Sequence, residues 1–254
     1  MDSTSFYDTD RAVSEYLLFH YGEDREVLPW GFGPVGALNY PARCVSELLD
    51  LGRLAAGARA LDLGCAVGRS SFELARHCAE VVGIDYSHPF VDAAIQLRRD
   101  GCMHYSFAEE GDIRTSAVAR VPSGIDRERV LFEQGDAQHL REDLGTFDVV
   151  LMANLLDRLP RPTELLRGLA GRVRSGGQLL VTTPCTWLEE YTGREEWLGG
   201  YERDGVQVRT RFTLGQVLGG DFECIAEVDL PFLIREHSRK FQWSVAMGTV
   251  WIRR

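Results

Sequence analysis

The stretch Leu61-Asp-Leu-Gly-Cys-Ala-Val-Gly68 decides the fold. It begins inside a short apolar run, Arg59–Leu63, which predicts a buried strand, and it leads into Arg69–Cys78, which predicts a helix. Small residues between a strand and a helix let the backbone turn sharply and approach a ligand closely. The glycines follow an acidic residue, Asp62, and are spaced GxxxG rather than GxGxxG. The stretch therefore predicts a nucleotide-binding turn at the edge of an α/β sheet.

Strands and helices alternate after this turn. Further strands are expected at Glu80–Asp85, Val130–Glu133, Phe147–Met152 and Gly177–Thr182, with helices at His88–Arg99 and Pro162–Val173. Such alternation is typical of a parallel sheet with helices on both faces. Two strand-like runs close the chain, Phe222–Leu230 and Trp243–Ile252, with no long helix between them. We therefore expect a Rossmann-like α/β fold whose seven-stranded sheet is mostly parallel, with an antiparallel C-terminal strand.

The pattern divides the chain into an extension and a core. Residues 1–57 read as a helical extension, with helices at Asp8–His20 and Pro41–Leu54, and we expect it to cover the substrate. The core spans 58–254 and carries insertions at about 101–128 and 184–212. Connections of this length are commonly functional or mobile. The aromatic residues of the second insertion suit a lid or pocket wall, and for each insertion a helical decoration on the surface is the alternative.

Composition excludes several classes of protein. The 254 residues carry a formal net charge of -10 and no basic stripe, which argues against a nucleic-acid partner. No apolar run is long enough to cross a membrane. The six cysteines form no CxxC pair and no cluster with histidine, so no metal site is expected. The polar N-terminus is unlike an export signal, and we expect a cytoplasmic protein.

Carboxylates at two strand ends indicate the cofactor. An acidic residue at position 62 attracts a cation, and S-adenosylmethionine carries a sulfonium and an α-ammonium group. We expect Asp62 to order the ammonium end, directly or through water. Asp85 ends the next strand, 21 residues after Gly64, where a carboxylate can accept bonds from both ribose hydroxyls. The alternative for Asp85 is a carboxylate at a helix start, since Ser87 and Pro89 follow.

Residues at the ends of the third and fourth strands are also expected to contact the cofactor. We call each of these four strand ends a station. Gly135-Asp136-Ala137 suits the adenine amino group, and Met152-Ala-Asn-Leu155 lies where cofactor and substrate would meet. The fourth station lacks the Asn/Asp-Pro-Pro-aromatic sequence found in many methyltransferases that act on nucleobase amines. The expected cofactor-binding residues are Asp62, Gly64, Cys65, Ala66, Gly68, Arg69, Asp85, Tyr86, Asp136, Ala137, Asn154 and Leu155.

Three longer strings are the most specific in the chain: Thr186-Trp-Leu-Glu-Glu-Tyr-Thr192, Glu195-Glu-Trp-Leu-Gly-Gly200 and Ile234-Arg-Glu-His-Ser-Arg-Lys-Phe-Gln242. They resemble a particular family among the class I methyltransferases, the 5-thiohistidine (4-mercaptohistidine) N-methyltransferases of ovothiol biosynthesis. The resemblance implies transfer of a methyl group from S-adenosylmethionine to an imidazole ring nitrogen, leaving S-adenosylhomocysteine. It also implies the stand-alone form, with a separate sulfoxide synthase as a partner in the pathway.

An amino-acid acceptor needs an anion for its ammonium group and a cation or amide for its carboxylate. The hypothesised catalytic residues are Asp157, Tyr21 and His20, and the hypothesised substrate-binding residues are Asn39, Tyr40, Arg158, Trp187, Glu190 and Glu236. Arg158 is the preferred carboxylate partner. Structural alternatives remain: His20 and Trp187 as core residues, Asp157 and Arg158 as a solvated pair, and Glu236 paired with a nearby arginine.

Three other functions remain open at this point. The first is a methyltransferase for another small metabolite, acting on nitrogen, oxygen or sulfur. The second is a nicotinamide dehydrogenase, against which Asp62 and the missing third glycine argue. The third is a non-catalytic module that keeps the fold for partner binding, against which the complete set of cofactor stations argues.

Overall fold

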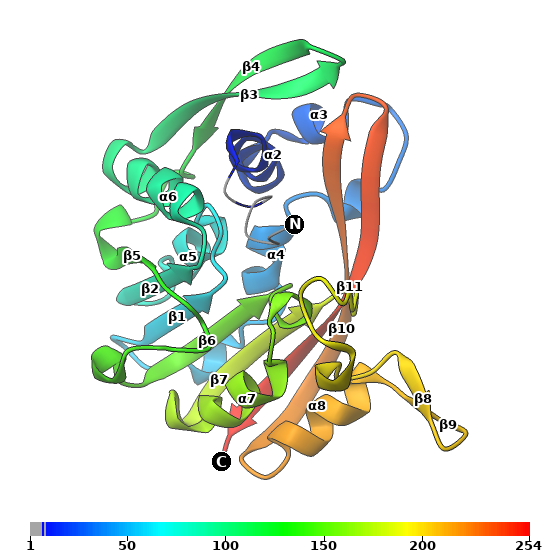
Figure 1. The fold of residues 1–254 in the computed structure, drawn as a ribbon. Helices are drawn as coiled ribbons and strands as arrows, with labels where there is room; N and C mark the ends of the chain where they lie inside the picture. Colours follow the sequence, from blue (N-terminus) through cyan, green and yellow to red (C-terminus); the bar gives the residue numbers. More distant parts are fainter. Residues whose placement is uncertain (1–6, 8) are drawn as a thin grey trace.

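The computed structural model describes residue 7 and residues 9–254, which build a seven-stranded sheet in the order β10-β11-β7-β6-β1-β2-β5 (Figure 1). Its strands are β1 (Arg59–Leu63), β2 (Glu80–Asp85), β5 (Val130–Gln134), β6 (Phe147–Ala153), β7 (Val173–Thr183), β10 (Phe222–His237) and β11 (Lys240–Arg253). β5, β2, β1, β6 and β7 pair in parallel, and β11 runs antiparallel to β7 and β10. The expected mostly parallel sheet with an antiparallel C-terminal strand is confirmed.

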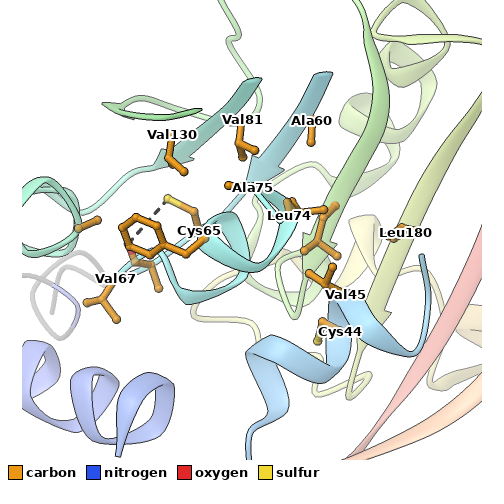
Figure 2. Packing of buried hydrophobic residues seen from close by; sticks show 14 of the residues in the cluster. Cys44, Val45, Ala60, Cys65, Val67, Leu74, Ala75, Val81, Val130 and Leu180 are labelled. Atoms are coloured by element: carbon orange, nitrogen blue, oxygen red, sulfur yellow. Dashed lines mark hydrogen bonds between the residues drawn. The ribbon is translucent and has the colours of Figure 1, made fainter. Parts of the chain in front are cut away.

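Helices cover both faces of the sheet because its strand residues are buried on both sides. α2 (Asp10–Tyr21), α4 (Tyr40–Ser46), α5 (Arg69–Leu74) and α6 (His88–Asp100) lie on one face, and α7 (Pro162–Gly168) and α8 (Thr210–Leu218) on the other (Figure 1). Alternate residues serve the two cores: Val149 and Leu151 join the first, and Val150 and Met152 the second. Figure 2 shows part of the first core, where α4 and α5 pack toward the sheet.

Three expected helices are longer in the sequence pattern than in the structure. The helix expected at Pro41–Leu54 ends at Ser46, and Asp50 instead caps a 3-10 turn, η2 (Leu51–Arg53), by accepting a bond from the Gly52 N–H. The helix expected at Arg69–Cys78 ends at Leu74. The one expected at Pro162–Val173 ends at Gly168, followed by the 3-10 turn η6 (Leu169–Gly171), because Val173 already pairs with Phe147 in the sheet.

The described part of the N-terminal extension is mainly helical. α2 begins at Asp10, where Thr9 caps it by accepting a bond from the Ala12 N–H, and Asp8 of the expected helix lies outside the described residues. A short helix α3 (Asp24–Val27) and a 3-10 turn η1 (Val35–Ala37) connect it to α4. The sequence pattern missed α3 and also α8, which starts inside the second insertion.

The first insertion is a β-hairpin, so the helical alternative for it is wrong. β3 (Cys102–Glu110) and β4 (Ile113–Arg120) pair antiparallel, with Phe107, Ala117 and Ala119 buried. The 3-10 turn η3 (Arg127–Arg129) leads on to β5. The second insertion holds the 3-10 turn η7 (Arg194–Glu196) and a small hairpin, β8 (Tyr201–Arg203) and β9 (Val206–Val208).

A cap stands over the carboxyl edge of the sheet, which we define as α2, α3, the β3–β4 hairpin and the outer end of the β10–β11 hairpin, residues 230–246. α2 lies between the two hairpins in Figure 1 and contacts both. Arg235 connects the parts of the cap. Its guanidinium donates to Glu109 (2.6 Å) and to the Glu26 carbonyl, and it stacks over Phe107, 4.9 Å from the ring centre.

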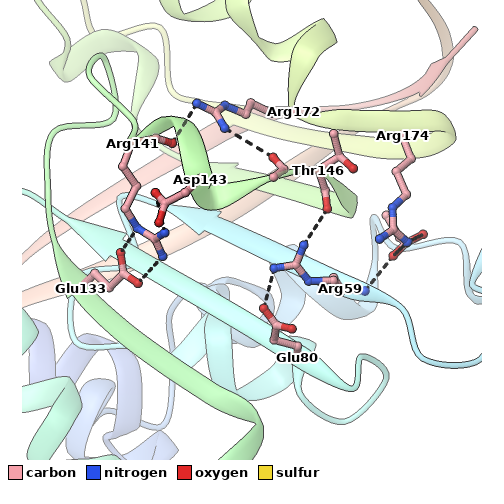
Figure 3. Close-up of polar contacts among 10 residues, drawn as sticks. Arg59, Glu80, Glu133, Arg141, Asp143, Thr146, Arg172 and Arg174 are labelled. Carbon is pink, nitrogen blue, oxygen red and sulfur yellow. Dashed lines mark hydrogen bonds and ion pairs between the residues drawn. The ribbon is translucent and has the colours of Figure 1, made fainter.

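The opposite, amino edge of the sheet carries a network of ion pairs. Arg59 at the start of β1 donates to Glu80 at the start of β2 (2.6 Å) and to the Thr146 carbonyl (3.0 Å), as Figure 3 shows. Arg174 pairs with Asp148 at the same edge. The 3-10 turn η4 (Glu142–Leu144) is held by bonds from Arg172 to nearby carbonyls. These charged groups have partners, whereas Asp62 Oδ1 and His20 Nδ1 near the carboxyl edge have none among the described residues.

Candidate cofactor and acceptor site

The turn after β1 is held against the end of β2. The N–H groups of Gly64 and Cys65 donate to the Ile84 carbonyl, at 2.8 and 3.1 Å. Gly64 and Gly68 have φ values of +72° and +85°, which favour glycine, and a Cβ on Gly68 would lie 2.5 Å from the Phe132 ring. Gly64 faces Leu155, so two expected cofactor residues from different strand ends lie together. The Cys65 side chain points into the first core (Figure 2), which leaves only its backbone for a ligand.

Asp62 is fully buried beneath this turn. One carboxylate oxygen accepts bonds from the hydroxyls of Ser70 (2.7 Å) and Ser71 (2.6 Å) at the start of α5. The other oxygen, Oδ1, has no hydrogen-bond partner among residues 7 and 9–254. Burial raises the pKa of Asp62 to about 6, against the opposing effect of the two serine bonds. A buried acceptor of this kind fits a cationic group of a ligand or a bridging water.

Asp85 joins the turn to the start of α6. It accepts bonds from the backbone N–H groups of Ala66 (2.8 Å) and Ser87 (2.9 Å), and the helix cap itself is Ser87, whose hydroxyl accepts from the Phe90 N–H. A carboxylate has about four acceptor positions, so these two bonds are compatible with further bonds to ribose hydroxyls. Tyr86 follows with its side chain 59% exposed, a ring surface available for stacking.

The third station continues this edge. The Gly135 N–H donates to the Asp85 carbonyl (2.9 Å), which sets the end of β5 beside the end of β2. Asp136 is half-buried and accepts from the Gln138 N–H (2.8 Å), with its second oxygen 2.8 Å from the His139 ring. Ala137 is buried behind it. The carboxylate of Asp136 thus sits at the strand end where the sequence predicts contact with an adenine amino group.

The fourth station includes a residue that the sequence reasoning missed. Asn154 adopts a left-handed backbone with φ of 53° after β6, and its Oδ1 accepts from the Tyr40 hydroxyl (2.7 Å) and from Thr182 on β7 (3.0 Å). Tyr40 was expected to bind substrate and is 2% exposed. The only sequence signal for a role of Thr182 is its hydroxyl, at the carboxyl end of a mainly apolar strand.

Two expected catalytic residues of α2 approach the same turn. The Tyr21 hydroxyl donates to the Val67 carbonyl (2.8 Å), so α2 is fastened to the loop between β1 and α5. His20 is buried, and its Nδ1 has no partner within the described part of the chain. Burial, reinforced by the positive charge of Arg69, lowers the pKa of His20 to about 3. Arg69 itself forms an ion pair with Glu73. His20 is therefore a neutral imidazole at physiological pH.

Asp157 and Arg158 lie side by side after β6, in the 3-10 turn η5 (Leu156–Arg158). The buried Asp157 carboxylate accepts from the Thr186 N–H (2.9 Å) and lies 3.3 Å from the Arg158 guanidinium. Burial raises the pKa of Asp157. The Arg158 guanidinium also donates to the Thr186 carbonyl and stacks over Tyr191, 4.8 Å from its ring centre, and its side chain is 27% exposed. A cation held on several sides and still partly open suits recognition of a carboxylate.

The remaining expected substrate residues do not join this cluster. Trp187 packs in the second core and donates its indole N–H to Thr210 (2.9 Å). Asn39 is exposed and bonds to Asp24, and Glu190 is exposed. Glu236 pairs with Lys240 (2.6 Å) at the outer end of the β10–β11 hairpin, rather than with Arg235 or Arg239.

Two further properties of the described residues bear on the site. In the described part of the chain, no three His, Cys, Asp or Glu side chains are grouped so that they could hold a metal ion. No described helix has the length and apolar character needed to span a membrane. A cleft of about 640 Å³ lies on the outer side of the cap between Trp30, Phe32 and Trp243, and none of the cofactor stations lines it.

The carboxyl edge therefore combines a glycine turn, a buried carboxylate oxygen with no partner among the described residues, a carboxylate at the end of β2 and an exposed aromatic ring. On this sheet order, these features define the class I methyltransferase fold, and they fit a nucleoside that bears a positive charge. A family of proteins described as a methyltransferase domain matches residues 37–221. The chain belongs to this family of S-adenosylmethionine-dependent methyltransferases, and its cofactor is S-adenosylmethionine.

Curated relatives share part of the chain. It is 32% identical over 152 residues to a ubiquinone biosynthesis O-methyltransferase of Xanthomonas oryzae pv. oryzae, covering 59% of this chain and 52% of that protein. A protein of the same name from Coxiella burnetii is 26% identical over 127 residues, covering 50% of this chain and 44% of that protein. The chain thus spans about half the length of these relatives.

Solved structures share the fold over nearly the whole chain. Magnesium protoporphyrin IX methyltransferase of Synechocystis PCC 6803, with bound S-adenosylhomocysteine, aligns with a TM-score of 0.55 and 17% identity, covering 100% of this chain and 96% of that chain. The cyclase SpnF aligns with a TM-score of 0.58 and 17% identity, covering 99% of this chain and 95% of that chain. At this identity the similarity shows the fold alone.

Proposed function

We propose that this protein transfers the methyl group of S-adenosylmethionine to a small, amino-acid-like molecule. The observation that carries the proposal is Asp62, whose buried Oδ1 lacks a partner among the described residues directly below the glycine turn. An uncompensated buried acceptor costs about 1–3 kcal/mol, so it suits a position that a ligand donor completes. In this proposal Asp62 serves the ammonium end of the cofactor and Asp85 serves its ribose.

The bound cofactor supplies an electrophilic methyl group on a positively charged sulfur. The acceptor's lone pair forms the new bond to carbon while the electrons of the breaking carbon–sulfur bond stay on sulfur. The protein's part is to bind and orient, because the three reacting atoms must be in line. Arg158, held by Asp157 and Tyr191, would bind the acceptor's carboxylate. His20, kept neutral by burial, can exchange a hydrogen bond with the acceptor without adding a charge.

For the acceptor we propose a ring nitrogen of 5-thiohistidine. Support comes from the strings at 186–192, 195–200 and 234–242, which resemble the thiohistidine N-methyltransferases. The partly open guanidinium of Arg158 adds support, because an amino-acid acceptor needs a cation for its carboxylate. An uncharged imidazole nitrogen is nucleophilic and a protonated one is not. Surroundings that disfavour imidazole protonation, as burial and Arg69 do at His20, are consistent with this acceptor. A cytoplasmic location and a separate sulfoxide synthase remain part of the same proposal.

The test is a methyl-transfer assay with labelled S-adenosylmethionine and a panel of histidine, 5-thiohistidine, ergothioneine and a catechol. We expect label in 5-thiohistidine, with the methyl group on nitrogen by mass spectrometry and NMR. Label only in histidine would refute the acceptor proposal. Calorimetry gives the independent arm: wild type should bind S-adenosylmethionine, and Asp85→Ala should bind it about 10-fold to 100-fold more weakly, as expected for lost charged hydrogen bonds.

The second candidate is an O-methyltransferase for a small phenolic or similar acceptor. It is favoured by the similarity to proteins named ubiquinone biosynthesis O-methyltransferase. The same panel separates the two candidates, since label in the catechol and none in 5-thiohistidine would support oxygen methylation.

A further inference from the structure

A hydrogen-bonded triangle links the N-terminal extension to the carboxyl edge of the sheet. The Tyr40 hydroxyl lies 2.7 Å from Asn154 Oδ1 and 2.7 Å from Thr182 Oγ1, and Thr182 Oγ1 lies 3.0 Å from Asn154 Oδ1. The three residues come from α4, the loop after β6, and β7. Tyr40 is 114 residues from Asn154 and 142 residues from Thr182 in sequence, and all three meet at one point of the candidate site.

The Tyr40 ring has a fixed position. It is 2% exposed, lies 4.9 Å from the Phe232 ring of β10, and stacks on Phe19 of α2 with ring centres 6.0 Å apart. Burial raises the pKa of Tyr40 well above its usual value, so the hydroxyl keeps its proton and acts as a donor. The triangle is therefore a rigid support.

The contacts of Tyr40 and Thr182 determine which end of the Asn154 carboxamide is available to a ligand. Oδ1 is the acceptor of the triangle, within hydrogen-bond distance of the Tyr40 and Thr182 hydroxyls, whose two hydrogens are shared over its three sides. The Asn154 backbone N–H donates to the Thr182 hydroxyl oxygen. The hydrogen bonds of the Asn154 side chain to described residues all involve Oδ1 and none involves Nδ2, and Asn154 is half-buried rather than enclosed. The next residue, Leu155, contacts Gly64 of the cofactor turn. The amide thus presents only donor hydrogens beside that turn.

We propose that Tyr40 is a positioning residue that fixes the Asn154 carboxamide so that Nδ2 donates to the methyl acceptor. The inference rests on the proposed function and adds a selection rule: the acceptor carries a hydrogen-bond-accepting atom beside its nucleophile. In 5-thiohistidine that atom is the thiolate sulfur. A donor bound to the thiolate lowers its nucleophilicity and leaves the ring nitrogen to react. Tyr40 acts through Asn154 and touches no substrate.

A double-mutant cycle tests the coupling. Asn154→Asp keeps the acceptor oxygen, tolerates the left-handed backbone and removes the donor. We expect Tyr40→Phe to lower kcat about tenfold, the effect of one misplaced hydrogen bond, with the affinity for S-adenosylmethionine changed less than about twofold. We expect Asn154→Asp to lower kcat further, and Tyr40→Phe to have no additional effect in that background. Additive effects would overturn the proposal.

The product ratio gives a readout that a purely structural role would not move. Tyr40→Phe should raise the share of sulfur-methylated product relative to nitrogen-methylated product. Tyr105→Phe is the matched control, because it removes a buried tyrosine hydroxyl that has no partner in the described chain, and it should leave both kcat and product ratio unchanged. An equal rise in the control, or no rise in Tyr40→Phe, contradicts the proposal.

A spectroscopic arm is independent of turnover. In 15N NMR of the full chain with S-adenosylhomocysteine, the Asn154 side-chain amide should be a single resolved pair of signals in wild type. In Tyr40→Phe it should broaden or double as the carboxamide rotates. An unchanged Asn154 signal would overturn the positioning role. Failure of the wild type to methylate any acceptor would instead refute the proposed function, while this arm still decides the role of Tyr40.

Discussion

At the scale of single residues, the site depends on buried ionisable groups whose charge is set by their surroundings. Asp62 and His20 are both buried, and burial shifts their pKa values in opposite directions, to about 6 and about 3. Desolvation disfavours the charged form of each group. At neutral pH the turn therefore presents one anion below it and one neutral imidazole beside it, a pattern suited to holding a cationic cofactor.

The first prediction concerns the pH dependence of cofactor binding. The pKa of Asp62 is raised to about 6, so the carboxylate is charged above this pH and protonated below it. The affinity for S-adenosylmethionine should therefore fall by up to about tenfold per pH unit below pH 6. Calorimetry between pH 5 and pH 8 measures this, and Asp62→Asn should bind weakly with little pH dependence. A flat wild-type profile would contradict the assignment of Asp62.

The second prediction concerns His20. Its folded-state pKa, about 3, lies below the ordinary value of 6.5, so the unfolded chain binds the proton first. His20 should therefore favour the folded state fully above about pH 6.5 and lose this contribution as the pH falls toward 3, by about 1.4 kcal/mol per pH unit. Urea unfolding of wild type and His20→Gln at pH 5 and pH 7.5 measures it. An equal pH effect in both proteins would show that His20 is not the source.

At the scale of elements, the β1–α5 turn is restricted both by backbone conformation and by packing. Gly68 has φ of +85°, and a Cβ there would meet the Phe132 ring at 2.5 Å and Ala94 at 3.2 Å. Gly57 has a similar φ of +78° but open space around it. The two positions separate the cost of the left-handed conformation from the cost of crowding.

The third prediction uses that pair. Gly57→Ala should lower the free energy of unfolding by about 1 kcal/mol, the cost of an alanine in the left-handed region. Gly68→Ala carries the same cost plus about 1–3 kcal/mol for overpacking, and it should also weaken cofactor binding because the turn shifts. Denaturant unfolding and calorimetry provide the two measurements. Equal destabilisation by both substitutions would show that the Phe132 contact yields without cost.

At the scale of the whole molecule, the cap is joined by long-range contacts around Arg235. This side chain is 2% exposed and connects β10 to Glu109 on β3 and to the end of α3. Trp30 adds a bond from its indole N–H to the Ser238 carbonyl (3.0 Å) at the tip of the same hairpin. The position of α2, and with it His20 and Tyr21, depends on this joint.

The fourth prediction is a loss of stability when the joint is broken. Arg235→Ala leaves Glu109 without its buried partner and should lower the free energy of unfolding by about 3 kcal/mol or more. The exposed Arg239 on the same hairpin is the control, and Arg239→Ala should cost no more than about 1 kcal/mol. Thermal and urea unfolding measure both. If the two variants lose the same free energy of unfolding, Arg235 does not join the cap.

Much of the fold, and the positions of the expected cofactor residues at the strand ends, follow from local sequence. Asp62, Gly64 and Asp85 were placed correctly at strand ends because strand ends, helix starts and glycine turns are signalled by neighbouring residues. The acceptor half was harder to predict. Trp187 was expected at the substrate but lies in the second core, and Thr182 was missed, because the sequence does not show which distant surfaces pack together.

The sequence by itself determined the seven strands of the main sheet and the acidic glycine turn, since periodicity and backbone conformation are properties of short segments. Only the tertiary structure decided that Tyr40 meets Thr182, 142 residues away, and that Arg235 meets Glu109, 126 residues away. These long-range contacts depend on the path of the whole chain, because a side chain's partners are set by which elements pack beside it.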